Sequence, residues 1–191
     1  MNLLQLTSNS LVKNLPIHRP RSSTIKNLLY LNSAMYAYYL FGSGPQRLKY
    51  EHRFAAGPES SYLSLFNFHF SHTSLTQFLF TSGVLYTLGN YHVTAYGCNH
   101  FLRLFALSAL GGSVLHAIGL QSGATQHVQA GAMAPAAGLI AYHVFRNPGW
   151  FQFFLKPLPL LALLTLYGAF YGDRAAIGGI SFGYLAFIFG L

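Results

Sequence analysis

The stretch GAMAPAAGLIAYH, residues 131–143, decides the fold because it gathers very small side chains into one apolar segment. In a bilayer, helices associate through close packing rather than through exclusion of water, so small side chains mark the most buried helix. We therefore expect a membrane span over residues 126–145 at the centre of a helix bundle. The stretch also contains Met133, an apolar residue at a position where a polar side chain would give the segment a different chemistry.

The composition indicates a membrane protein. Charged residues make up 7% of the 191 residues, against 52% hydrophobic ones, whereas water-soluble domains carry about 25% charged residues. The net charge is +8, and the cations flank apolar runs, which fits anionic lipid headgroups rather than nucleic acid. Cys98 is the only cysteine, which excludes an intrachain disulfide and a cysteine-based zinc or iron–sulfur site built by this chain alone.

We expect an all-α fold, a polytopic membrane bundle of six transmembrane helices over residues 25–191, preceded by a basic arm over residues 1–24. The arm contains cations and no acid, as mitochondrial targeting segments do, and we expect it to stay on the protein, held by a partner or by headgroups. Residues 44–70 are predicted to form a loop with an aromatic end in the interface. Besides 126–145, the expected spans are 25–43, 73–89, 99–120, 153–172 and 175–191.

The last expected span repeats the small-residue pattern. Gly179 and Gly183 form a GxxxG pair, with Gly178 beside them, and such pairs allow helix backbones to approach closely. The fourth and sixth spans are therefore predicted to touch.

These residues resemble the rhomboid family of intramembrane serine proteases, whose fourth span begins with GxSG. Gly131, Ala132, Gly138 and Leu139 fit that frame. Met133 stands where the family has its nucleophilic serine, and Ala134 stands in place of the following glycine.

The resemblance extends over about residues 25–191. In the block FSHTSLTQFLFTSGVLYTLG, residues 70–89, His72 matches the family's first histidine, while Gln77 and Thr81 replace the second histidine and the asparagine, which serve the oxyanion in that family. Gly89 and Gly97 match glycines at the end of the second span and eight residues later. The segment FFLKPLPLLALL resembles the family's entry to the fifth span.

The resemblance implies a pseudoenzyme. Ile180, three residues before Gly183, occupies the position of the general-base histidine, and no histidine follows His143. A hydroxyl nucleophile needs a base within hydrogen-bonding reach, so Ser181 alone is a weak nucleophile. We therefore expect no enzyme activity, and no catalytic, cofactor-binding or metal-binding residue.

The histidines allow a haem or metal hypothesis. His127 and His143 stand 16 residues apart, about 24 Å along one helix, so they do not share a metal. His116 and His127 have the spacing to meet across a turn, but histidines bonded to loop carbonyls are the expectation there. We expect His72 to have a structural hydrogen-bonding role, and the pair formed by Asp173 and Arg174 to be a solvated turn or a partner or lipid contact.

The function expected on these grounds is that of a non-catalytic accessory subunit of a large complex in the mitochondrial inner membrane, with the electron-transport respiratory chain as first host. The partners would be other subunits and phospholipids, cardiolipin among them, and not nucleic acid. The alternatives are an ATP synthase subunit and a derlin-like, client-binding pseudoprotease of membrane-protein quality control. Derlins carry a Trp-Arg pair in the first loop, and here Trp150, the only tryptophan, precedes Phe151.

Overall fold

The computed structural model describes residues 22–58, 61–122, 130–147 and 174–190. Of these residues 84% are helical and none lies in a β-strand, so the expected all-α class is confirmed. The expected fifth span, 153–172, and residues 1–21 of the basic arm lie outside the described residues, and so do His127, Trp150 and Asp173.

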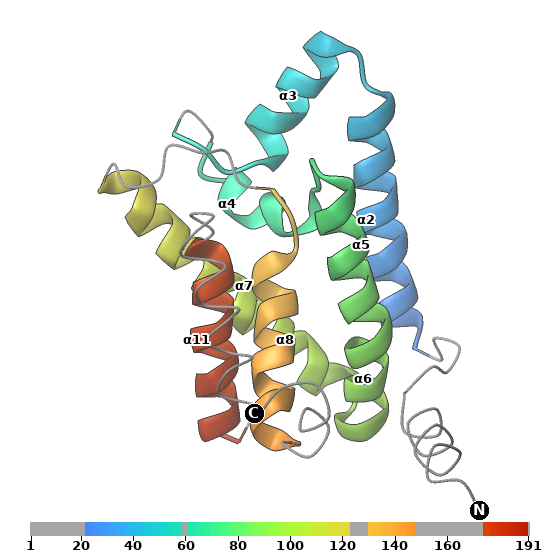
Figure 1. Cartoon of the computed structure of the whole chain (residues 1–191), viewed down its shortest axis with the longest axis vertical. Coiled ribbons are helices and arrows are strands. Elements are labelled where there is room, and N and C mark those ends of the chain that lie inside the picture. The colour runs from blue at the N-terminus through green and yellow to red at the C-terminus, as the bar shows by residue number, and fades with distance from the viewer. Residues whose placement is uncertain (1–21, 59–60, 123–129, 148–173, 191) are drawn as a thin grey trace, which may run out of the picture.

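The helices pack side by side, with a shorter helical segment across one end (Figure 1). In order along the chain, the elements are α2 (Ser23–Phe41), α3 (Gly44–Phe54), α4 (Ser64–Asn67), the 3-10 turn η1 (Phe68–Phe70), α5 (Leu75–Val84), the π-helical turn η2 (Leu85–Gly89), α6 (Asn90–Tyr96), α7 (Cys98–Gln121), α8 (Met133–Arg146) and α11 (Arg174–Ile188). In Figure 1, α8 lies between α11 and α5, α7 passes behind them, and α2 flanks α5.

Three helices, α7, α8 and α11, form the centre of the bundle. Every side chain from Met133 to Val144 in α8 is buried, which confirms this segment as the most enclosed helix. A Cβ added to Gly179 would collide with the backbone of Ala134, and one added to Gly183 would collide with the backbone of Gly138. The predicted contact between the fourth and sixth helices is therefore confirmed, and it joins backbone to backbone.

The second helix continues past its expected end. Residues 75–96 run without a break through α5, η2 and α6, a rise of about 33 Å at 1.5 Å per residue. Gly89 lies inside this run, where a Cβ would stand 3.0 Å from the Ile25 Cδ1 atom. The prediction of a span ending at residue 89 was wrong because Gly89 serves close packing, while the turn glycine is Gly97, with φ of +89°.

The expected loop over 44–70 is largely helical. Ser43 and Gln46 form a reciprocal capping box that starts α3, and such a box satisfies two backbone donors that a helix start leaves open. The segments α4 and η1 then carry the aromatic end of the stretch.

The fourth helix begins later than predicted. Gly131 has φ of +126°, a value outside the helical region, so α8 begins only at Met133 instead of residue 126. Its 14 residues rise about 21 Å. The expected spans 25–43 and 99–120 correspond within two residues to α2 and α7, and 175–191 corresponds to α11.

One helix among the described residues, α7, is both long and apolar enough to cross a membrane. The other helices are shorter or more polar by the same measure. Six spans therefore remain a prediction from the sequence.

We predict that Gly183→Ala lowers the free energy of unfolding by about 1–3 kcal/mol, because the added methyl overpacks the contact with Gly138. Gly83→Ala is the matched control: nothing lies within 4 Å of a Cβ at this exposed position of α5. Alanine there raises stability by up to about 1 kcal/mol through helix propensity. Thermal unfolding of both purified variants in one detergent measures the difference, and equal stabilities would contradict the close packing.

Candidate functional site

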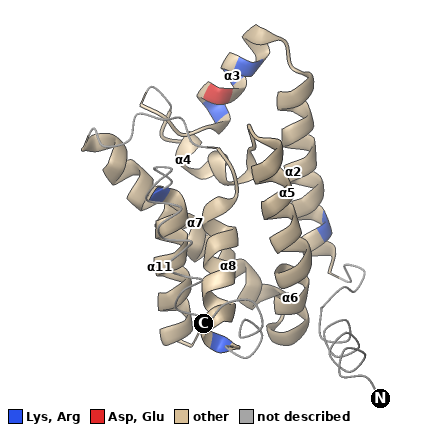
Figure 2. Cartoon of the chain, viewed as in Figure 1, with Lys and Arg blue, Asp and Glu red and all other residues tan. Residues whose placement is uncertain are grey.

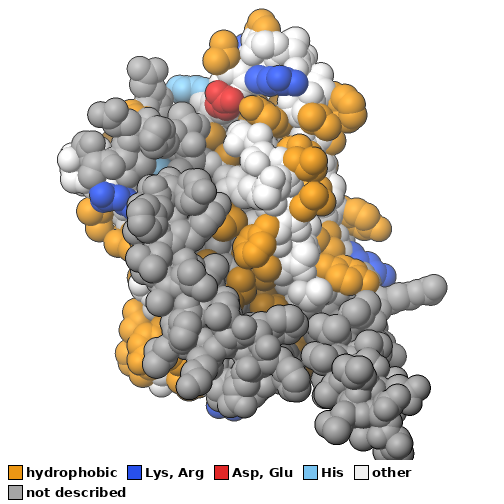
Figure 3. Space-filling view, in the orientation of Figure 1, with side chains coloured by type: hydrophobic (Ala, Val, Ile, Leu, Met, Phe, Trp, Pro, Cys, Tyr) orange, Lys and Arg blue, Asp and Glu red, His pale blue; other side chains and the backbone are white. Residues whose placement is uncertain are grey.

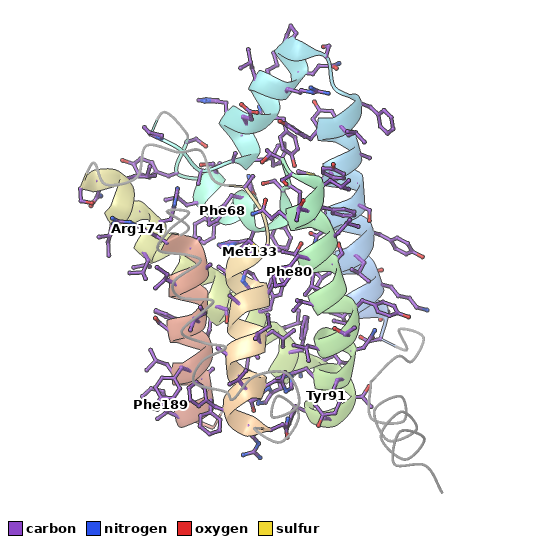
Figure 4. The ribbon with its side chains drawn as sticks, viewed as in Figure 1. Phe68, Phe80, Tyr91, Met133, Arg174 and Phe189 are labelled. Carbon is purple, nitrogen blue, oxygen red and sulfur yellow. The ribbon has the colours of Figure 1, made fainter. Side chains whose placement is uncertain are left out.

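The site that the resemblance singles out lies where α8 begins. Met133 and Ala137 of α8 form a small apolar cluster with Ala176 of α11, and Ile180 of α11 packs against it. Figure 4 shows Met133 at the end of α8 nearest Phe68. Met133 and Ile180, which the resemblance equates with the serine and the histidine, thus lie in one cluster. Their side chains are a thioether and a hydrocarbon.

The chain enters this site through a fixed turn at Gly131. The Gly131 N–H donates to the Phe68 carbonyl oxygen at 2.7 Å, which ties the turn to η1. The side chain of Gln77, reaching from α5, fills the space that a Cβ on Gly131 would need. Glycine is therefore required here for both its backbone angle and its missing side chain.

The resemblance equates Gln77 and Thr81 with oxyanion donors, but the Thr81 hydroxyl is already bonded. Its hydroxyl donates to the Gln77 carbonyl oxygen at 2.9 Å within α5, and its side chain is fully buried. A buried hydroxyl that bonds its own helix has no hydrogen left to donate to a substrate.

The ring of His72 lies buried against Phe78, edge-on at 5.4 Å between centroids. Neither ring nitrogen has a hydrogen-bond partner among the described residues, and only the backbone N–H bonds, to the Tyr50 hydroxyl at 3.2 Å. The expected structural hydrogen bond of His72 is thus made by its backbone and not by its ring. Burial lowers the pKa of His72 to about 4, so this imidazole stays neutral.

Ser181 does not belong to the site. Its side chain is exposed, and its hydroxyl donates to the Ile177 carbonyl oxygen at 3.0 Å. The apolar cluster at Met133 therefore contains no hydroxyl and no base.

Two buried histidines, His69 and His116, attach the segment between α3 and α5 to α7. His69 shares a 2.9 Å hydrogen bond with the Ser113 hydroxyl, which in turn donates to the Leu65 carbonyl oxygen at 2.6 Å. His116 bonds the Ala56 carbonyl oxygen at 3.1 Å, which confirms the expectation of a loop carbonyl as its partner. No group of three His, Cys, Asp or Glu within the described ranges has an arrangement that holds a metal ion.

Sequence reasoning missed a second polar cluster, formed by His92, His100 and His143. Tyr91, whose ring lies 5.3 Å from that of His143, marks its place in Figure 4, at the end of the bundle opposite Met133. The sequence does place His92 and His100 on either side of the turn at Gly97, which indicates that these two histidines lie near each other. Nothing in the sequence pairs them with His143, because that contact depends on how α6 packs against α8.

No protein-family model matches the chain, and no curated protein matches it.

We predict that cysteines at positions 133 and 180 cross-link within one chain. In a Cys98→Ser background, Met133→Cys with Ile180→Cys places two thiols in one cluster, so a short bis-methanethiosulfonate reagent bridges them, as mass spectrometry of fragments detects. Met133→Cys with Ser181→Cys is the control, because Ser181 is exposed outside the cluster. Equal cross-linking of both pairs would contradict the arrangement of α8 and α11.

Proposed function

We propose that this chain is a non-catalytic, rhomboid-like membrane bundle that serves as an accessory subunit of a large mitochondrial inner-membrane complex, with a respiratory-chain complex as first host. The observation that carries the proposal is the apolar cluster at Met133 and Ile180. Met133 and Ile180, which the resemblance equates with the serine and the histidine, hold side chains that neither donate nor accept a proton, and this supports a non-catalytic role.

The distribution of charge supports a membrane location. In the described residues, charged side chains occur on α3 or near the ends of the other helices (Figure 2). They are Lys26, Arg47, Lys49, Glu51, Arg53, Arg103, Arg146 and Arg174. Charges at the bilayer centre are costly, while cations at the ends of a span reach the headgroups.

Exposed apolar side chains support the same location. Large hydrophobic side chains stand exposed on α2, α5, α7 and α11, with Tyr30 at 71% and Phe189 at 75% exposure. In Figure 3 hydrophobic side chains line the side formed by α2 and α5 and cover the lower part of α11. Such faces are covered in the native setting by lipid chains or by other subunits.

The six-span arrangement rests on five described helical segments and one expected segment. The run 75–96 and α7 are long enough to cross about 30 Å of hydrocarbon, and α2 has 19 residues. The shorter α8 and α11 lie in the bundle centre, and the sixth span is the one expected over residues 153–172 from their apolar composition.

A structural role fits better than client handling. The arm over residues 1–24 has the composition of a mitochondrial targeting segment, and a basic segment of this kind is suited to a partner surface or to anionic lipids such as cardiolipin. The Trp-Arg pair of the derlins is missing from the first loop. In the described residues the cations lie on α3 and near the ends of other helices, a distribution that fits lipid headgroups better than nucleic acid.

We predict that the chain co-migrates with a respiratory complex when native membranes are solubilised in mild detergent and separated on blue-native gels. Detection uses an antibody against the chain together with markers for each respiratory complex and for the ATP synthase. Co-migration with the ATP synthase would show that the ATP synthase, and not a respiratory complex, is the host. Migration as the isolated chain or in small species would overturn the subunit proposal and favour the client-binding alternative.

Loss of catalysis is tested separately. We predict that a fluorophosphonate probe, which labels activated serines, leaves the wild-type protein unlabelled, because no serine in the cluster at Met133 meets a base. An active serine hydrolase in the same membranes is the positive control. Labelling of the wild-type chain would contradict its non-catalytic character.

A further inference from the structure

Three histidines form one continuous hydrogen-bonded row at the end of the bundle opposite Met133. The His100 Nδ1 and His92 Nε2 atoms are 2.8 Å apart, and the His92 Nδ1 and His143 Nε2 atoms are 3.1 Å apart. The His143 Nδ1 atom lies 3.4 Å from the Asn147 Nδ2 atom. We name these four residues the histidine row, and it joins α6, α7 and α8 with the residue that follows α8.

The row links two points at the surface through an enclosed interior. His92 and His143 are fully buried, whereas His100 and Asn147 are half-buried. Both nitrogens of His92 and of His143 are therefore in reach of a neighbour, and these two imidazoles are shielded from water. Both ends of the row lie at the same end of the bundle.

With the Asn147 amide nitrogen facing His143, at 3.4 Å from its Nδ1 atom, one arrangement of protons satisfies every hydrogen bond of the row. An amide nitrogen only donates, so His143 Nδ1 accepts and the proton of His143 lies on Nε2. That proton is donated to His92 Nδ1, which places the His92 proton on Nε2 and directs it to His100 Nδ1. All three imidazoles are thus neutral, and each carries its proton on Nε2.

The surroundings keep the row neutral at rest. The rings of Tyr96, Tyr142 and Tyr91 pack around it, together with Phe101 of α7. Two cations lie near the row in the described residues: Arg146, which contacts the Tyr96 hydroxyl, and the exposed Arg103, one turn after His100 on α7. Glu51 is the only acid in the described residues and belongs to α3, so within these residues no carboxylate stabilises a lasting imidazolium.

We propose that the histidine row is a proton relay, which takes up a proton at the Asn147 end and releases one at the His100 end. An arriving proton binds the His143 Nδ1 atom as the Asn147 amide turns to present its oxygen. The His143 Nε2 proton then passes to His92 Nδ1, and the His92 Nε2 proton passes to His100 Nδ1. His100 releases its Nε2 proton, so one proton enters, one leaves, and every imidazole ends neutral with its proton on Nδ1.

The relay follows from the geometry because each step needs only a proton shift along an existing hydrogen bond. Imidazole is the side chain suited to this task, since it both accepts and donates through two distinct nitrogens. Bonding of both nitrogens also stabilises a buried ring, so the proton exchange of His92 with water, rather than the geometry of the row, separates a relay from a rigid network. The activity is independent of the proposed subunit role, and a respiratory host is one setting that consumes protons at a membrane face.

The first test reads the position of each proton by NMR on full-length protein labelled with 15N-histidine, at alkaline pH so that no ring holds two protons. We expect nitrogen–nitrogen couplings across the bonds from His143 to His92 and from His92 to His100, with all three protons on Nε2. In Asn147→Asp the carboxylate accepts the His143 Nδ1 proton, which reverses the row and moves the His100 proton to Nδ1.

The control for this test is Asn99→Asp, which puts the same charge next to His100 in sequence at an exposed position outside the row. A through-space charge effect would shift the His100 proton at least as strongly in Asn99→Asp. A relay shifts it in Asn147→Asp alone. Missing couplings, or a His100 proton that stays on Nε2 in Asn147→Asp, would overturn the proposal.

The second test separates a relay from a rigid structural row by proton exchange with water. In the wild type we expect the buried His92 N–H to exchange faster than neighbouring backbone amides, because the row carries protons without local unfolding. His100→Phe closes the exit and slows this exchange about tenfold or more, while His72→Gln, a buried histidine elsewhere, leaves it unchanged. If His100→Phe exchanges at the wild-type rate, the row does not conduct.

Discussion

The backbone contact between α8 and α11 is the constraint on which the rest of the structure depends. At Gly138, Gly179 and Gly183 no side chain separates the two helices, so their backbones are in direct contact. Apolar side chains facing lipid gain little from helix association, so close packing of backbone atoms supplies the attraction. The same closeness explains why small residues fill the first half of α8 and why every residue from Met133 to Val144 is buried.

Packing and chemistry are separable in this bundle. The contact between α8 and α11 sets Met133 beside Ala176 and Ile180, as the frame of an intramembrane protease would set a nucleophile and a base. The frame is held by glycine and alanine, which take no part in catalysis. The apolar side chains of Met133 and Ile180 fill this space and pack with Ala137 and Ala176. A body of this kind is suited to assembly with other membrane components.

Much of the fold was predictable because it rests on local composition. The bounds of α7 follow from a long, mostly apolar run, and the contact between α8 and α11 follows from their small residues. The start of α8 at Met133 was not predictable, because it depends on the positive φ of Gly131 and on the side chain of Gln77. The histidine row escaped sequence reasoning for a similar reason, since it joins residues separated by 51 positions.

The measurement that tests the packing claim most directly is hydrogen–deuterium exchange of the full-length protein in lipid nanodiscs, read by mass spectrometry. The account predicts that the amides of α8 and α11 exchange most slowly, at the rate of global unfolding, and that α3 exchanges much faster. If α8 and α11 exchange as fast as α3, their close contact does not hold the bundle together, and the account fails.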